Sequence, residues 1–171
     1  SIAEQIRPTL MKQMGLESLP TLDIIFTAED EVLNGFAVPA NYTIIWVDQN
    51  DAALWTGDEK WLRTVLAHEL QHLVYFNTVK GPWWLPEPMN SLVHGTPAWI
   101  VEGIAEYFTE EWRPFRYELS HRYHVLRNTV HKIQDPHNDG YSKSLYLADR
   151  FGDSTISKIL NHRKKLKILD F

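Results

Sequence analysis

The chain has 171 residues, a formal charge of −5, 44% hydrophobic residues and no cysteine. This length and composition are typical of one soluble globular domain, and they exclude disordered and fibrous classes. The acidic balance offers no basic surface, so we expect no nucleic-acid partner. Without cysteine, disulfides and thiolate metal sites are excluded, and any metal must be held by histidine and carboxylate.

No stretch reaches the roughly 18 apolar residues of a membrane-spanning helix, and no signal peptide opens the chain. We therefore expect no transmembrane segment in this chain. A start at Ser1 without Met is consistent with a piece of a longer protein that has additional domains beyond either end. We treat residues 1–171 as a single domain, with a sheet part at about 16–55 and a helical part at about 56–171.

The first elements follow from periodicity and turn residues. Apolar residues at helical spacing predict a helix over residues 2–14 that stops at Gly15. β-branched and aromatic residues predict three strands, over 21–27, 36–40 and 42–47. Pro39 cannot donate a hydrogen bond to a neighbouring strand, so the second strand should lie at the edge of a sheet.

A long, mostly apolar helix is predicted to follow, over residues 56–76, and Thr56 and Glu59 fit a capping box at its start. Its polar stripe is narrow. The stripe consists of Lys60, Arg63, Ala67 and Gln71. The other faces of this helix, which include its two histidines, are therefore expected to point inward.

His68, Glu69 and His72 form a His-Glu-x-x-His motif inside this helix. Histidines four residues apart project from one helical face, where two neutral imidazoles can hold one Zn²⁺ while Glu69 reaches a water beside it. The alternative is a buried helix that carries these residues for packing alone. Unpaired polar groups in a core cost several kcal/mol, which favours the metal site.

Downstream, the Pro-, Gly- and Trp-rich residues 77–94 predict an ordered loop near the site. Thr96 and Pro97 predict the start of a helix over 98–108, as a cap followed by proline at the first helical position. Residues 115–133 predict a further helix, and residues 135–140 predict a break in the chain. Another helix is predicted to run from Tyr141 to Gly152, with a last one after it.

Glu102 is the candidate third metal ligand, because a carboxylate inside the apolar helix 98–108 is badly placed without a partner. Glu106 shares its face, four residues on. One carboxylate can bind the metal while the other accepts the outer ring N–H of a histidine ligand. The alternative is that both are surface positions of an amphipathic helix.

The two motifs together, His68-Glu-Leu-Gln-His72 and Trp99-Ile-Val-Glu102-Gly-Ile-Ala-Glu106, resemble the gluzincin metallopeptidases. The likeness is to the aminopeptidase N-like members of the peptidase MA-like superfamily. It implies one Zn²⁺ per chain on His68, His72 and Glu102, with Glu106 matching the acidic residue behind a ligand. It also implies a thermolysin-like fold: α+β, a small, mostly antiparallel sheet over the active-site helix, and a helical C-terminal half.

Residues from Tyr141 to Ser144 are similar to a third stretch of the family, whose tyrosine stabilises the tetrahedral intermediate. The resemblance therefore implies that Tyr141 is catalytic. It also suggests an exported or cell-envelope location and a peptide or protein substrate. The segment between His72 and Glu102 is longer than in the typical aminopeptidase.

The expected activity is zinc-dependent peptide-bond hydrolysis with Glu69 as the base. Aminopeptidases hold the substrate amine with an acid in a Gly-x-Met-Glu-Asn strand, and the matching segment here, 35–41, has none. A peptide can still pair with the strand edge at Gly35, Phe36, Ala37 and Val38. Endopeptidase and aminopeptidase action both stay open. The alternatives are an inactive zinc-binding module closed by a fourth ligand such as His94, and a zinc hydrolase of a non-peptide substrate.

Overall fold

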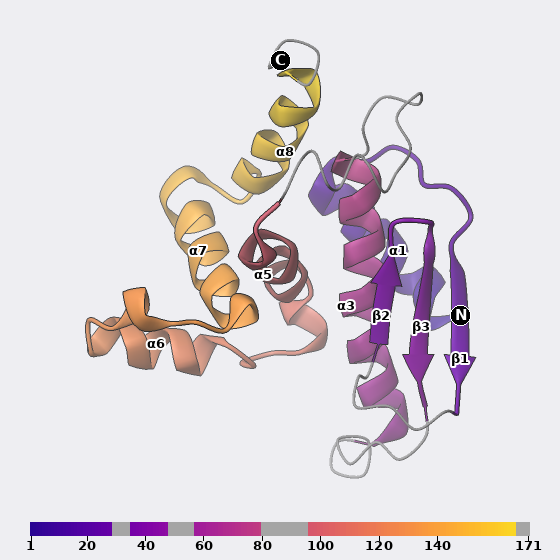
Figure 1. Cartoon of the computed structure of the whole chain (residues 1–171), viewed down its shortest axis with the longest axis horizontal. Coiled ribbons are helices and arrows are strands. Elements are labelled where there is room, and N and C mark those ends of the chain that lie inside the picture. Colours follow the sequence, from indigo (N-terminus) through magenta and orange to yellow (C-terminus); the bar gives the residue numbers. More distant parts are fainter. Residues whose placement is uncertain (29–34, 48–56, 80–95, 167–171) are drawn as a thin grey trace.

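The computed structural model describes residues 1–28, 35–47, 57–79 and 96–166, and for Asp58 and residues 162–166 it describes the backbone alone. The protein is α+β, with six α-helices and one small sheet in its described part (Figure 1). The helices are α1 (Ile2–Met14), α3 (Asp58–Val79), α5 (Ala98–Phe108), α6 (Glu118–Leu126), α7 (Pro136–Phe151) and α8 (Thr155–Leu166). The strands are β1 (Asp23–Thr27), β2 (Gly35–Val38) and β3 (Tyr42–Trp46), and two short 3₁₀ helices are η1 (Glu110–Trp112) and η2 (Val130–Lys132).

The sheet has the order β1-β3-β2, with β1 parallel and β2 antiparallel to β3. The sheet is therefore mixed, and the prediction of a mostly antiparallel sheet is wrong. The tight turn after β2, in which Asn41 has φ 69°, makes β2 and β3 an antiparallel pair, and β1 then adds to the other side of β3. Strand β2 lies at the edge of the sheet, as we expected from Pro39.

Helix α3 lies between the sheet and the C-terminal helices, and it packs on β2 and β3 (Figure 1). The predicted polar stripe is wrong for Ala67 and Gln71, because both are fully buried. Helix α1 packs against α3, and Arg63 donates a hydrogen bond to Gln5 of α1 at 3.3 Å. Helix α1 ends at Gly15, in the left-handed region at φ 69°, as predicted.

The C-terminal half is helical, as predicted, but three of its helices have boundaries that differ from the prediction. The predicted helix 115–133 is shorter, because Asn128 has φ 53° and the chain continues into η2. The predicted break at 135–140 is wrong, because Asp135 accepts backbone hydrogen bonds from His137 and Asn138 and caps α7. Helix α5 has Pro97 rather than Thr96 at its cap position, with no side-chain hydrogen bond.

Helices α5 and α7 approach each other closely at Gly103 and Gly140. A Cβ atom on either glycine would overlap the backbone of the other helix, so neither position accepts a side chain in this arrangement. The contact brings the first turn of α7 opposite the turn of α5 that carries Glu102. The backbone contact therefore fixes which side chains can meet between the two helices.

Two predictions fall outside the described residues. Thr56 of the predicted capping box is one, and α3 begins at Asp58. The other is the predicted loop, of which residues 77–79 form the end of α3 and residues 80–94 are not described, so His94 as a fourth metal ligand lies outside the described residues as well. Among the described helices, none combines the length and apolar character that a membrane crossing requires.

Candidate metal centre

His68, His72 and Glu102 converge on one point between α3 and α5. The two Nε2 atoms are 3.1 Å apart, and Oε2 of Glu102 lies 3.5 Å from that of His68 and 3.3 Å from that of His72. Donor atoms bound tetrahedrally at 2.0–2.1 Å from Zn²⁺ are about 3.3 Å apart. The spacing of the three donor atoms and the His₂Glu chemistry both fit a zinc ion.

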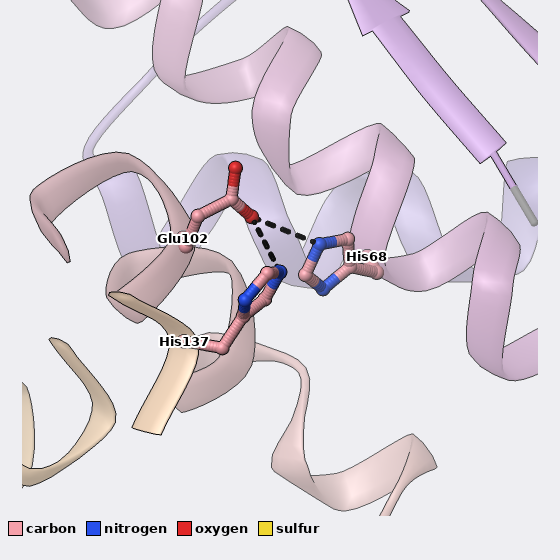
Figure 2. Close-up of side chains that lie close together, drawn as sticks. All are labelled: His68, Glu102 and His137. Carbon is pink, nitrogen blue, oxygen red and sulfur yellow. Dashed lines mark ion pairs between the residues drawn. The ribbon is translucent and has the colours of Figure 1, made fainter. Parts of the chain in front are cut away.

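His137, in the first turn of α7, is a fourth side chain at this point. Its Nε2 lies 3.0 Å from Oε2 of Glu102, and its Nδ1 lies 3.1 Å from Oδ1 of Asp135. Figure 2 shows the rings of His68 and His137 pointing toward the same Glu102 carboxylate. The group of His68, Glu102 and His137 could itself hold a metal ion, with donor atoms within 4.8 Å of one another.

The group that includes His72 is the tighter of the two, because all three of its donor separations are 3.5 Å or less. His72 is therefore the better placed candidate ligand, and His137 pairs with Glu102. Sequence reasoning missed His137. The signal that could have found it is Asp135 followed by Pro136, a cap residue before proline at the first helical position.

We call His68, His72 and Glu102 the metal group. Glu106 lies behind His68, on the side of the ring opposite the other two members of this group. Its Oε1 is 3.4 Å from Nδ1 of His68, although the two atoms are not aligned as a hydrogen bond. The same oxygen lies 3.8 Å from Arg113 and 3.5 Å from Arg116. Nδ1 of His72 is buried without a hydrogen-bond partner in the described part of the chain.

Glu69 is buried beside β2, the edge strand. The backbone N–H of Ala37 donates a hydrogen bond to its carboxylate. A Cβ atom added to Gly35 would lie only 2.7 Å from Oε1 of Glu69, so this strand passes as close to the carboxylate as a backbone without a side chain allows. Of the other predicted substrate-binding residues, Phe36 is half exposed, and its carbonyl accepts a hydrogen bond from Thr43 of β3.

Tyr141 is not brought to the metal group. Its side chain is buried, and its hydroxyl donates a hydrogen bond to Glu110 at 2.7 Å. Tyr141 does not line the cavity beside Glu69, whereas His137 does. The catalytic role predicted for Tyr141 therefore stays a prediction.

Burial and hydrogen bonding shift the pKa values of the glutamates and histidines at this site away from their ordinary values. Burial raises the pKa of Glu69 to about 7 and lowers that of His68 to about 4. Burial would also raise the pKa of Glu102, but its hydrogen bonds to His137, His68 and His72 outweigh this and hold the pKa well below its ordinary value. The same bond to Glu102 raises the pKa of His137 to about 9.

Comparison with family models, with curated proteins and with solved structures finds no match for this chain. The arguments for its function therefore come from the geometry and chemistry of the site.

The raised pKa of Glu69 predicts a pH-dependent stability difference in the metal-free protein. Between its ordinary value of 4.5 and about 7, the folded state holds more protons at this site than the unfolded state, so the contribution of Glu69 to stability falls as pH rises. Glu69→Gln removes this titration. The free energy of unfolding of the variant, minus that of the wild type, should be higher at pH 8 than at pH 5 by about 2–3 kcal/mol.

Denaturant unfolding with a chelator present measures this difference at the two pH values. Comparing the variant with the wild type removes most of the contribution from groups that titrate equally in both. An unchanged difference between pH 5 and pH 8 would contradict the assignment of a raised pKa to this carboxyl.

Proposed function

We propose that this chain is a zinc-dependent peptide hydrolase in which His68, His72 and Glu102 hold one Zn²⁺. The observation that carries the proposal is the convergence of these three donor atoms, no more than 3.5 Å apart, next to a buried carboxylate. Glu69 and His68 both line a cavity. A purely structural zinc site would be closed by four protein ligands and would have no use for a carboxylate in such a cavity.

The chemistry divides between the metal and the residues around it. Bound there, Zn²⁺ would lower the pKa of a water toward about 7 and polarise the scissile carbonyl. Glu69 accepts the proton of the attacking water and returns it to the leaving amine. Its burial favours the protonated carboxyl, which makes proton uptake at neutral pH easier than for an exposed glutamate.

In this proposal the Nε2–H of His137, which bonds Glu102 in the metal-free protein, turns to the oxyanion once Glu102 binds the metal. In the metal-free protein, the bond to Glu102 raises the pKa of His137 to about 9, which favours the cationic ring with an N–H on both nitrogens. Asp135 accepts from Nδ1 and fixes the orientation of the ring. Removal of such a donor costs about 10²- to 10³-fold in kcat in other hydrolases.

The edge strand β2 is the proposed guide for an extended substrate. Among the described strands its only neighbour is β3, and Gly35 lies against Glu69, so a peptide paired with the other edge of β2 would pass beside the base. The arrangement of β2 beside α3, with α5 packed on α3, is also what supports a thermolysin-like fold. The strand carries no acid to hold a substrate amine, which leaves internal peptide bonds as the broader substrate class.

Metal removal and replacement test the proposed function. Purified protein should carry about one zinc ion per chain and cleave a denatured protein substrate. Treatment with a chelator should abolish both the zinc signal and cleavage, and one equivalent of Zn²⁺ should restore both. Zinc binding without cleavage would instead favour the inactive metal-binding module. Cleavage that survives complete zinc removal would contradict the proposal.

The role of His137 is separable from that predicted for Tyr141. His137→Gln should lower kcat by about 10²-fold and leave the zinc content unchanged, because the ring is a donor and not a ligand. Tyr141→Phe should keep kcat within a few-fold, since its hydroxyl is bonded to Glu110. Steady-state kinetics with metal analysis of both variants measures this. A large loss in Tyr141→Phe with none in His137→Gln would reverse the assignment.

A further inference from the structure

A cavity of about 400 Å³ opens directly beside the metal group. His68, Glu69 and His137 form its wall on that side. Lys60 of α3 and two arginines that follow η1 line other parts of the same cavity. The part of a substrate that occupies this cavity therefore lies next to the bond that is cut. The charges that line the cavity should then affect which substrates bind.

The two arginines, Arg113 and Arg116, are not fully engaged by the carboxylate they face. Both approach the same atom, Oε1 of Glu106, at 3.8 and 3.5 Å. These distances exceed the 2.7–3.2 Å or so of a hydrogen bond, and each guanidinium has five N–H donors. Each side chain is about one-third exposed. Two guanidinium groups thus share one carboxylate, and both arginines line the cavity.

The backbone between the two arginines is strained. Phe115 has φ 66°, in the left-handed region, which costs an ordinary L-residue roughly 1–2 kcal/mol. Its side chain is 63% exposed, so burial of the ring does not offset this cost. The turn instead brings Arg113 and Arg116 to a common point beside the cavity. Strained backbone of this kind clusters at functional sites.

The remaining lining strengthens the effect of these charges. Trp61, Trp112 and Pro114 line the cavity with apolar surface. Apolar walls lower the local dielectric, so a charge that enters interacts more strongly with the lining than it would in water. Lys60 adds an exposed ammonium group to the same cavity.

We propose that this cavity binds a carboxylate of the substrate through Lys60, Arg113 and Arg116, so that the enzyme selects peptides with a negative charge beside the scissile bond. The inference rests on the proposed peptide hydrolase function. An Asp or Glu side chain and a free C-terminus present the same planar anion, and the arginine fork matches its two oxygens.

Matched peptides test this selectivity. One set carries Glu or Gln at each position flanking a fixed scissile bond, and a second set has a free or amidated C-terminus. At one or more positions the charged peptide should have a kcat/KM roughly 10- to 100-fold above its neutral partner, as expected for charge-assisted hydrogen bonds. The two sets separate a side-chain carboxylate from a terminal one. Equal rates for charged and neutral peptides in both sets would overturn the inference and leave the hydrolase function intact.

Three variants locate the preference. Lys60→Gln and Arg116→Lys should each lower the charged-to-neutral ratio of kcat/KM, the first by loss of charge and the second by loss of the planar fork. Arg150→Gln, an exposed position that does not line the cavity, is the control for net charge and should leave the ratio unchanged. If Arg116→Lys fails to fold because of its contact with Glu106, Lys60→Gln still decides the question. An unchanged ratio in Lys60→Gln would overturn the assignment of these cations.

A binding measurement keeps the inference testable apart from catalysis. Calorimetric titration of the Glu69→Gln variant with an N-acetylated Glu peptide and its Gln partner should show tighter binding of the charged peptide. The difference should shrink at high salt. Equal affinities would overturn the carboxylate site even if no peptide is cleaved, whereas a preference without cleavage would mean that only the hydrolase function fails.

Discussion

Glu69→Gln should lower kcat for peptide hydrolysis by about 10³-fold while the zinc content stays at that of the wild type. The amide keeps the shape of the side chain but cannot accept the proton of the attacking water. Glu69 is not among the three converging donors, so its loss should leave the metal in place. Steady-state kinetics on a quenched peptide, with zinc analysis of the same sample, measures both quantities.

A matched control for this change is Glu59→Gln, on the same helix. The side chain of Glu59 is exposed and pairs with Arg63, so its neutralisation should leave kcat unchanged and cost little stability. This variant measures how the loss of a negative charge elsewhere on α3 affects kcat. Undiminished hydrolysis in Glu69→Gln would show that Glu69 is not the base, even if the zinc site is correct.

His72→Ala should lower zinc affinity far more than His137→Ala does. Loss of a ligand removes one of three bonds to the metal, whereas loss of a group that orients a ligand typically costs 10- to 100-fold, a range of roughly 1.4–2.7 kcal/mol. We therefore expect His72→Ala to lose zinc during purification and His137→Ala to retain it. Competition with a chelating dye measures both affinities.

The structure makes this comparison informative because two groups of donors share His68 and Glu102. If His137→Ala loses zinc and His72→Ala keeps it, the metal sits on the group that includes His137. Equal losses in both variants would indicate four protein ligands and a closed, structural site. Either result would remove His137 as the oxyanion donor and weaken the proposed hydrolase function.

The sequence predicts the local geometry of the candidate site, the part that one helix alone sets. His68 and His72 are four residues apart, and Glu102 and Glu106 repeat this spacing on a second helix, so each pair is set by helix geometry alone. That α3 buries its histidines also follows from its apolar periodicity. The fold class and the edge position of β2 follow in the same way from strand and helix patterns and from Pro39.

The parts that depend on contacts distant in the sequence were not predictable from it. Nothing in residues 23–27 and 42–46 specifies that they pair in parallel, because pairing direction is set by the chain path between them. His137 joins the site only because Gly103 and Gly140 let α5 and α7 touch. Arg113 and Arg116 meet at Glu106 through a strained turn at Phe115, which no pattern in residues 113–117 indicates.

Anomalous diffraction from crystals of the zinc-loaded protein, recorded above and below the zinc absorption edge, tests the proposed metal site most directly. We predict one strong peak per chain within about 2.0–2.2 Å of Nε2 of His68, Nε2 of His72 and Oε2 of Glu102, with His137 outside bonding distance. A peak bonded to His137 in place of His72, or no peak at this point, would contradict the site on which the proposed function depends.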